Sequence, residues 1–371
     1  MADGENSVLR AAAETIYADQ LAALAANDTG PRPDGWHLTP RAVRRFIIGD
    51  QTLGIDAKFV GDDALVDRCI VSLMGRQGLM LVGEPGTAKS LLSELLAAAI
   101  SGRSTAVIQG SAGIIEDHLR YGWNYALLLA EGPSARAMVP SPVLSAMQSG
   151  QIVRVEELTR CAPEVQDVLI SLMSEKTITV PELGSDYELR AKPGFNVIGT
   201  ANLRDRGVHD MSSALKRRFN FETVHPIADA GFEKALVARQ LSERMAEHAQ
   251  AEMPQSDVLD LLVTVFRDLR FGKLEDGTTV SSPKAVMSTA ETVNVAHAAT
   301  LDATYLDSGA VSGRHIARQL QGVVFKDDPE DARKLRGYVD LVARDRARKS
   351  AVWKDFFDAA KVGLSRSDTD K

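Results

Sequence analysis

The sequence has few cysteines and few aromatic residues, and it contains no long apolar run. Its two cysteines, Cys69 and Cys161, lie far apart and form no CxxC or Cys/His spacing, and none of the seven histidines falls in an HExxH pattern. These absences argue against a disulfide framework and a bound zinc ion. No apolar stretch reaches the roughly 18–20 residues that span a bilayer, and the N-terminus lacks the charged-then-apolar order of a signal peptide. We therefore expect a cytoplasmic protein whose cysteines are reduced and serve in packing.

Positive charge is also scarce relative to negative charge. The 371 residues carry a net charge of −7, which argues against general binding to nucleic acid. The lack of a long apolar run leads us to expect no membrane association. The one basic run, at residues 344–349, is explained by a solvated helix face. The hydrophobic share of 44% and the charged share of 25% are ordinary values, and the length suits one α/β domain followed by a helical domain.

Five short apolar runs are separated by helical stretches within residues 37–228. This alternation predicts an α/β domain built on a parallel sheet with crossover helices. Two segments interrupt the rhythm, residues 111–143 and residues 176–193, and the second reads as a β-hairpin around a Gly-Ser-Asp turn. The predicted strands are residues 79–83, 105–109, 151–155, 195–200 and 219–224.

Helical periodicity dominates the two ends of the chain. Residues 1–36 predict an N-terminal helical segment, residues 229–355 an all-helical lid, and residues 356–371 a flexible tail. Within the lid, Ser282-Pro283 and Asp328-Pro329 each combine an N-cap residue with a proline at the first helical position. Each pair therefore predicts the start of a helix.

The segment Gly83–Ser90 joins an apolar strand to an amphipathic helix. Glycines that tolerate positive φ let backbone N–H groups converge on a phosphate, and a helix N-terminus favours an anion. Lys89 is placed to reach the β- and γ-phosphates of ATP, and the Ser90 hydroxyl to bind Mg²⁺. Ala88 stands where the strict pattern has glycine. The predicted nucleotide-binding residues here are Gly83, Glu84, Pro85, Gly86, Thr87, Ala88, Lys89, Ser90 and Leu91.

Two adjacent acidic residues, Glu156 and Glu157, follow the predicted strand 151–155. At the carboxyl end of a parallel strand, one carboxylate can hold Mg²⁺ through its water shell while the next polarises the attacking water. A strand that ends in solvated acids is the alternative. Glu156 is one methylene longer than the aspartate usual at this place. Arg154 is unusual inside a central parallel strand, and we expect it to be paired or to line an interface.

Two later segments complete the pattern. Asn202 follows the predicted strand 195–200, where it either hydrogen-bonds the attacking water or the γ-phosphate, or forms a turn. Arg217 and Arg218 precede the last strand, where one of them either reaches the phosphate of a neighbouring subunit or pairs with surface acids. The order strand-loop-Lys-Ser, strand-Glu-Glu, strand-Asn and Arg-Arg-Phe makes the joint case stronger than any single motif.

These residues resemble the MoxR group of AAA+ ATPases over roughly residues 55–225. The segments that carry the resemblance are GEPGTAKS, EELTR, EVQDVLISLMSEK, GTAN and ALKRRFNF. Within that group, PRPDGWHLTPRAV and YGWNYALLLAEGP are most similar to the YehL-type branch. The resemblance implies a five-stranded P-loop core, an insertion in the second helix, a hairpin before the Asn motif, and a hexameric ring that binds and hydrolyses Mg-ATP.

The resemblance also assigns roles. Lys89 and Ser90 bind phosphate and Mg²⁺, Glu156 and Glu157 are the Walker B pair, and Asn202 is the sensor.

Further assignments concern the neighbouring subunit, the adenine and the lid. Arg218 is favoured over the arginine before it as the finger that acts in trans. The backbone of Val60 and Gly61 either flanks the adenine or forms a turn into a helix. Lys284 stands where family members often carry an arginine at the start of a lid helix, and Arg314 competes with it as the second sensor.

Family resemblance further implies that ATP turnover remodels or activates a partner protein, often one with a von Willebrand A domain. The two interrupting segments are the candidate surfaces, and Tyr121, Trp123 and Tyr125 either engage a partner or pack the insertion. Two other hypotheses remain. Ala88 and Glu156 suggest a nucleotide-gated assembly module with little hydrolysis, whereas a DNA helicase or loader is disfavoured by the acidic balance.

Overall fold

The computed structural model describes residues 10–202, 209–246, 248, 250–307, 309–325 and 328–366. The chain forms two compact units. The first comprises residues 1–84 and 88–224, and the second comprises residues 85–87 and 225–371. No helix among the described residues is both long and apolar enough to cross a bilayer.

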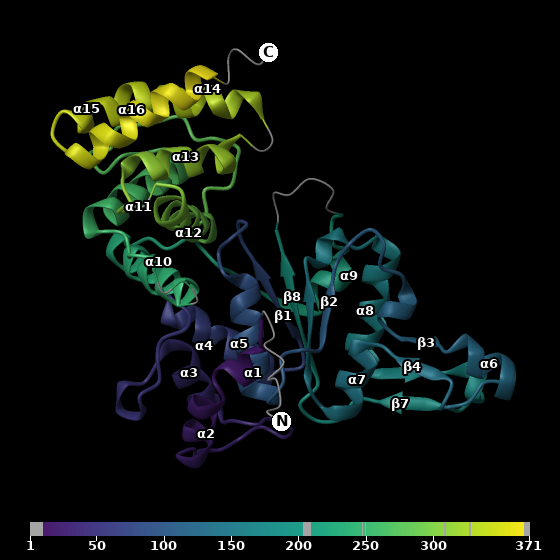
Figure 1. Ribbon diagram of the computed structural model, residues 1–371. Coiled ribbons are helices and arrows are strands. Elements are labelled where there is room, and N and C mark those ends of the chain that lie inside the picture. The colour runs from purple at the N-terminus through teal and green to yellow at the C-terminus, as the bar shows by residue number, and fades with distance from the viewer. Residues whose placement is uncertain are drawn as a thin grey trace, which may run out of the picture. The chain divides into compact units, whose positions relative to one another are not determined.

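The first unit is built on a five-stranded parallel sheet (Figure 1). Its strands lie in the order β2-β5-β8-β1-β9, and every neighbouring pair is parallel. The predicted sheet is confirmed, with each strand within two residues of its expected limits. The strands are β1 (Gly78–Val82), β2 (Val107–Gln109), β5 (Ile152–Glu156), β8 (Asn196–Ala201) and β9 (Phe219–Thr223).

Helices pack on both faces of this sheet because its strands are apolar on both faces. Leu79 and Leu81 of β1 belong to one buried cluster, whereas Met80 and Val82 belong to the other. Side chains alternate along a strand, so each face receives its own core. The first cluster includes α1 (Ala13–Ile16), α2 (Ala18–Ala26), α3 (Pro40–Ile48), α4 (Asp63–Met74) and α5 (Lys89–Ser101); the second includes α7 (Pro142–Ser149), α8 (Pro163–Glu175) and α9 (Ser213–Lys216). Both cysteines are buried with free thiols, as expected.

The two interrupting segments each form a small antiparallel pair. In the first, β3 (Tyr121–Trp123) pairs with β4 (Met138–Pro140) on either side of α6 (Tyr125–Glu131). In the second, β6 (Thr177–Thr179) pairs with β7 (Glu188–Arg190), which confirms the predicted hairpin.

We call the two interrupting segments, residues 111–143 and 176–193, the first and second insertions. The three aromatic residues of the first insertion differ in how far they are buried. The rings of Tyr121 and Trp123 meet edge to face with 5.9 Å between centroids. The Tyr121 hydroxyl donates to Glu182 of the second insertion at 2.9 Å. Tyr125 is 72% exposed on α6. Tyr121 and Trp123 are therefore half-buried between the two insertions, whereas Tyr125 is exposed.

The second unit is helical throughout its regular structure. The predicted apolar stripe of α11 (Val258, Leu261, Leu262, Val265 and Leu269) lies in its core. Its helices are α10 (Ala230–Met245), α11 (Ser256–Phe271), α12 (Thr289–Tyr305), α13 (Gly313–Val324), α14 (Pro329–Tyr338), α15 (Arg344–Ala347) and α16 (Ala351–Arg366), with a π-helical turn at Val339–Ala343.

One of the two predicted helix starts in this unit is wrong. Asp328 does cap α14, accepting from the Glu330 N–H. Ser282-Pro283, however, begins no helix, and α12 starts only after Ser288, whose side chain accepts from the Glu291 N–H. The reason lies elsewhere in the chain. The buried carboxylate of Asp331 accepts the Lys284 and Ala285 N–H groups at 2.7 and 2.8 Å and so holds this segment outside a helix.

The predicted flexible tail from residue 356 is also wrong as far as residue 366. Helix α16 continues to Arg366, and its Phe356 and Leu364 are buried in the core of the second unit. These apolar side chains recur at helical spacing and so anchor the helix. Residues 367–371 lie outside the described residues.

Candidate nucleotide-binding site

The loop that follows β1 has the backbone of a phosphate cradle. Its φ angles are 157° at Gly83, 74° at Gly86 and 64° at Ala88, and α5 begins at the next residue, Lys89. The Lys89 ammonium donates to the carbonyls of Gly83 and Glu84 at 3.2 and 2.7 Å, so the side chain folds back across the loop. Positive φ angles followed directly by a helix N-terminus are typical of an anion-binding turn.

Ala88 adopts the left-handed conformation that explains why glycine is usual at its position. A residue with a Cβ pays roughly 1–2 kcal/mol for this backbone conformation. Alanine in place of glycine at this position therefore raises the conformational free energy of the turn but does not alter its backbone conformation.

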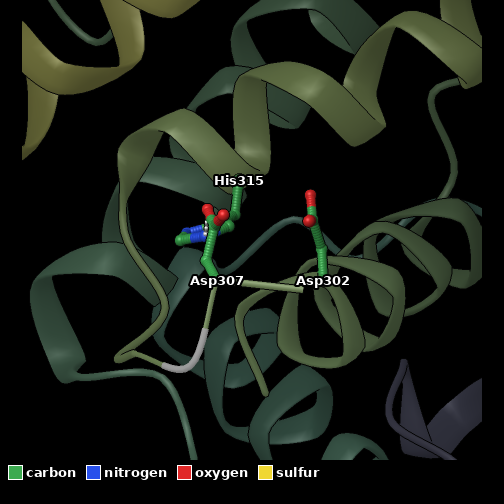
Figure 2. Close-up of side chains that lie close together, drawn as sticks. All are labelled: Asp302, Asp307 and His315. Atoms are coloured by element: carbon green, nitrogen blue, oxygen red, sulfur yellow. Dashed lines mark hydrogen bonds and ion pairs between the residues drawn. The ribbon is translucent and has the colours of Figure 1, made fainter. Parts of the chain in front are cut away.

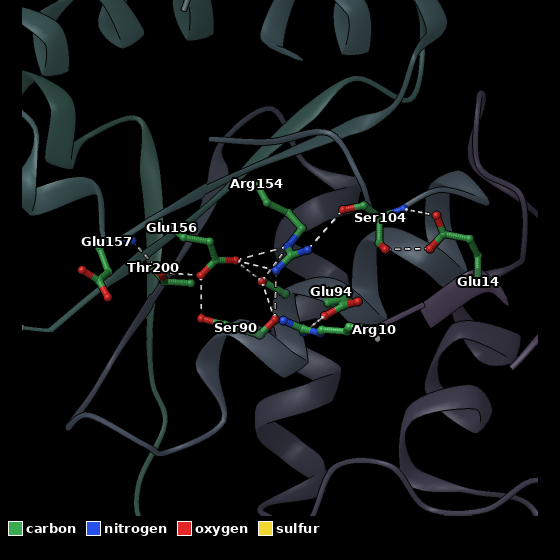
Figure 3. A network of polar contacts seen from close by, with 10 residues as sticks. Arg10, Glu14, Ser90, Glu94, Ser104, Arg154, Glu156, Glu157 and Thr200 are labelled. Carbon is green, nitrogen blue, oxygen red and sulfur yellow. Dashed lines mark hydrogen bonds and ion pairs between the residues drawn. The ribbon is translucent and has the colours of Figure 1, made fainter. Parts of the chain in front are cut away.

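Glu156, at the carboxyl end of β5, is the centre of a buried hydrogen-bond network (Figure 3). Its Oε2 accepts from Ser90 Oγ at 2.7 Å and from Thr200 Oγ1 at 2.8 Å. Its Oε1 accepts from Ser93 Oγ at 2.7 Å and pairs with Arg154 at 2.8 Å. Burial raises the pKa of Glu156, but the hydrogen bonds from Ser93 and Ser90, the positive charge of Arg154 and the hydrogen bond from Thr200 outweigh burial and hold this pKa below its usual value. The side chain is therefore an ionised carboxylate at neutral pH.

The donor set at this point suits a hard divalent cation. A serine hydroxyl and a carboxylate oxygen lie 2.7 Å apart, and Mg²⁺ prefers oxygen ligands of these kinds. The two residues predicted to bind Mg²⁺, Ser90 and Glu156, are thus brought together by the fold.

The expectation that Arg154 is paired is confirmed. Its guanidinium is buried and bonds to Glu156, to Ser93 and to the carbonyls of Ser90 and Ser104 (Figure 3). The charge inside the strand is thereby neutralised by a carboxylate two residues along the same strand.

The carboxylate of Glu157 lies outside this network, which Glu157 joins through its backbone N–H. Its φ of 52° is left-handed, its N–H donates to Thr200 Oγ1 at 2.9 Å, and its carboxylate pairs with Arg160 at 2.8 Å. The Gly110 N–H donates to the Glu156 carbonyl at 2.7 Å, and a Cβ on Gly110 would lie 2.3 Å from the Glu157 carbonyl oxygen. The turn that carries Glu157 is therefore held closely from two sides.

Asn202 and the arginine pair occupy opposite ends of the sheet. Asn202 directly follows β8, which lies between β5 and β1, and residues 203–208 after it are outside the described residues. Arg218, by contrast, precedes β9, and its carbonyl accepts the N–H of Gly78 at the start of β1. The five residues of β1 span about 16 Å, so Arg218 lies that far along the strand direction from the loop of its own chain.

The immediate surroundings of Arg218 form an open cavity of about 630 Å³ between α8 and α9. The Arg218 Nε donates to Ser174 Oγ at 2.7 Å, and Asp167, Ser171 and Glu175 also line the cavity. Arg217 is exposed, and its carbonyl accepts from the Gln77 side chain at 3.0 Å.

Comparison with known proteins identifies both parts of the chain. Residues 78–219 match the AAA domain (dynein-related subfamily), and residues 231–363 match the YehL-like AAA+ ATPase C-terminal domain. The uncharacterized protein YehL of Escherichia coli K12 is 47% identical over 360 residues, which cover 97% of this chain and 99% of that protein. The chain belongs to the YehL-like AAA+ ATPases.

More distant similarities cover less of the chain or are weaker. Uncharacterized proteins of Staphylococcus aureus are 29% identical over 180 residues, 48% of this chain and 62% of theirs. The RuvB Holliday junction branch migration motor of Thermotoga maritima is 13% identical with a TM-score of 0.45, covering 76% of this chain and 78% of its own. NtrX from Brucella abortus in complex with ADP is 13% identical with a TM-score of 0.47, covering 87% and 69%. These TM-scores are too low to carry a conclusion.

In this YehL-like chain the expected location of Lys284 at a helix start is wrong. Lys284 lies in the non-helical segment before α12, and its ammonium pairs with Asp328 at 2.7 Å. Val60 and Gly61 lie just before α4, whose N-cap is Asp62. Their contact with adenine stays a prediction.

The competing second sensor, Arg314, lies beside a cluster of two aspartates and a histidine near the end of α12 and the start of α13. Figure 2 shows the three side chains of this cluster. Asp302, Asp307 and His315 bring potential ligand atoms within 4.8 Å of one another. The Ser312 N–H donates to His315 Nδ1, so Nε2 carries the proton and donates to Asp307 at 2.9 Å. Arg314 also pairs with Asp307, at 3.2 Å.

A second guanidinium, that of Arg318, bridges the two carboxylates of this cluster, 3.5 Å from Asp302 and 3.2 Å from Asp307. Positive groups thus occupy the positions that a cation would take. We therefore assign no metal to the cluster, which links two helices by ion pairs.

Sequence reasoning missed Ser93, Thr200 and Gly110 as members of the site. Ser93 lies one helical turn after Ser90, which places both on one face of α5. Thr200 lies two residues before Asn202 and on the face of β8 that carries the Glu156 contact. These spacings are visible in the sequence, but their meaning depends on β5 lying beside β8.

Proposed function

We propose that this YehL-like protein binds and hydrolyses Mg-ATP at the Ser90–Glu156 site and works as a homo-oligomeric ring, with six subunits as the resemblance implies. The observation that carries the proposal is the 2.7 Å contact between the Ser90 hydroxyl and an ionised Glu156 beside a phosphate cradle. Bound Mg²⁺ would neutralise phosphate charge there, with Ser90 and Glu156 as its protein ligands.

The remaining side chains take the roles that their positions support. Lys89 would exchange its loop carbonyls for phosphate oxygens. Glu157 would orient the attacking water and accept its proton, with Asn202 at the end of the adjacent strand as the sensor. The location of Arg218 at the opposite end of β1 supports a role at the site of a neighbouring subunit.

Replacing Lys89 tests the site. Lys89→Ala should abolish ATP binding or turnover, because the cradle loses the charge that faces the phosphates. Binding is measured by fluorescence of an N-methylanthraniloyl-ATP, and turnover by phosphate release. Lys349→Ala, at a lysine that is 80% exposed, is the matched control and should behave as wild type. Unchanged ATP turnover in Lys89→Ala would contradict the assignment of this loop as the ATP site.

The ion pair between Glu157 and Arg160 favours a second candidate, a nucleotide-gated assembly module with little hydrolysis. The carboxylate that should orient water is engaged at 2.8 Å by Arg160. ATP binding and ring formation with negligible turnover, even with a partner present, would favour this candidate. Turnover that rises in Arg160→Ala would instead show that Glu157 is competent once it is released.

We infer that a partner protein, one with a von Willebrand A domain by resemblance, docks on the first insertion. Helix α6 presents Tyr125 and Leu129, which are 72% and 88% exposed. Large exposed apolar side chains on one short helix favour a protein contact. A Glu157→Gln variant with ATP should retain the partner, whereas the same variant with Tyr125→Ser and Leu129→Ser should lose it. Equal retention by both would move the partner site away from α6.

A further inference from the structure

Strand β5 places an arginine and a glutamate on the same face, toward α5. Arg154 and Glu156 are two residues apart, so both side chains leave the strand on one side, and both are more than nine-tenths buried. A buried charge pair is costly to form and is weak evidence for stability alone. A role in the site is therefore the stronger reason for its presence.

The guanidinium of Arg154 is fixed by three parts of the first unit (Figure 3). Its Nε and Nη2 donate to Glu156 Oε1 at 3.2 and 2.8 Å. The Nη2 also donates to the Ser90 carbonyl at 3.2 Å, and Nε to Ser93 Oγ at 3.0 Å. The Nη1 donates to the Ser104 carbonyl at 3.1 Å. The planar guanidinium group is held by carbonyls on two segments, so it cannot rotate without losing several of these hydrogen bonds.

The two oxygens of Glu156 have different partners. Oε1 takes Arg154 and Ser93, whereas Oε2 takes Ser90 and Thr200. Only Oε2 therefore faces the hydroxyl that is placed to bind the cation. A glutamate has one more rotatable bond than the usual aspartate, so its second oxygen needs a fixed partner if the first is to stay in place.

We propose that Arg154 is a positioning residue, which holds Oε1 of Glu156 so that Oε2 is presented to Mg²⁺ beside Ser90. The role rests on the proposed function, because it needs Mg-nucleotide at this site. In this role Arg154 acts through the glutamate and does not itself bind the nucleotide or the cation.

The test separates nucleotide binding from its dependence on Mg²⁺. Wild type, Arg154→Gln and Arg154→Lys are titrated with N-methylanthraniloyl-ATP in EDTA, and then with MgCl₂ at fixed nucleotide. Affinity in EDTA should change by less than about twofold, while the MgCl₂ midpoint for tight binding should rise by about 10–100-fold in Arg154→Gln. Arg154→Lys keeps the charge but loses the fork, so its midpoint should lie between the two.

An ion pair between a half-buried arginine and a buried aspartate in the other unit serves as the control. Arg346 pairs with the buried Asp268 at 2.7 Å, so Arg346→Gln should lower the melting temperature and leave the MgCl₂ midpoint unchanged. A wild-type midpoint in folded Arg154→Gln would overturn the proposal, as would an equal loss of affinity with and without Mg²⁺. If Arg154→Gln does not fold, Arg154→Lys decides in the same way.

The two proposals fail differently. Wild-type protein that binds no nucleotide under either condition would remove the proposed function, and the role of Arg154 with it. Wild-type protein that binds Mg-nucleotide while the Arg154 variants keep its MgCl₂ midpoint would remove the role of Arg154 alone.

Discussion

Two of the three described non-glycine residues with positive φ lie in the candidate site. Ala88 directly precedes α5, and Glu157 directly follows the carboxylate that faces Ser90, with φ values of 64° and 52°. Strained backbone of this kind persists only where the surrounding structure enforces it, and it concentrates at functional positions. The third, Lys176, ends α8 as a C-cap. The strain at Ala88 and Glu157 therefore supports the same assignment as the hydrogen bonds.

At Ala88 the backbone strain can be relieved by removing only a methyl group, so that no polar or charged side chain of the site changes. Ala88→Gly should raise the free energy of unfolding by about 0.5–1 kcal/mol, because relief of the left-handed cost exceeds the added entropy of the unfolded chain. Urea unfolding measures the change. Ala97→Gly, in the buried interior of α5, is the control and should lower stability by more than about 1 kcal/mol, because helix propensity and a buried methyl group are both lost. A loss of stability in Ala88→Gly would mean that the alanine methyl group is needed in the turn.

At the scale of elements, local signals located the strands but failed where a distant side chain decided the structure. The strands of the sheet can be recognised in the sequence as continuous apolar runs, because both of their faces are buried and polar residues do not alternate along them. Ser282-Pro283 carries the local signature of a helix start, yet Asp331, far along the chain, takes the amides that the helix would have used. No reading of residues 282–288 alone reveals that competitor.

Helix α16 was missed for a related reason, since its role depends on its packing against α13. Gly313 begins α13, and a Cβ on it would lie 2.3 Å from the Val352 carbonyl oxygen and 2.7 Å from the Phe356 nitrogen. The two helices therefore approach each other closely at a residue without a side chain. A predicted tail could not show this contact, because it needs both helices in place.

Because of this close approach, two glycine-to-alanine variants on α13 should change the free energy of unfolding in opposite directions. Gly313→Ala should lower the free energy of unfolding by about 1–3 kcal/mol, because the added methyl group overpacks the contact with α16. Gly322→Ala meets no atom within 4 Å and should raise it by about 0.5–1 kcal/mol through helix propensity. Both changes in the free energy of unfolding are measured by following the unfolding of the second unit in a chemical denaturant. Equal effects would contradict the close packing of α13 on α16.

At the scale of the whole molecule, the order of motifs along the chain predicted the site better than any motif did alone. Lys89, Ser90 and Glu156 were predicted to meet, and the parallel sheet brings them to one edge because it gathers the carboxyl ends of its strands. The central place of Arg154 was not predictable, because an arginine inside a strand is equally compatible with an interface. Its partners on α5 and after α5 become visible only in three dimensions.

The location of Arg218 leads to a prediction about assembly. Arg218→Ala and Glu157→Gln should each bind ATP and hydrolyse it poorly, since one lacks the finger and the other lacks the base. Mixed rings contain interfaces that combine an intact Glu157 with an intact neighbouring Arg218, and random mixing at equal amounts should restore about a quarter of wild-type turnover. Phosphate release measures the rescue, and native mass spectrometry confirms mixing.

The control for this rescue places both substitutions in one chain. Rings that mix Arg218→Ala with the double variant contain no intact Arg218, so they should stay inactive at every ratio. Turnover near the wild-type rate in Arg218→Ala on its own would show that the finger is not Arg218, and Arg217, one residue earlier and exposed, would take its place. The length of β1 separates Arg218 from the loop of its own chain, so the site that it can reach belongs to a neighbouring subunit. If confirmed mixed rings of the two single variants show no recovery of turnover, action in trans is contradicted.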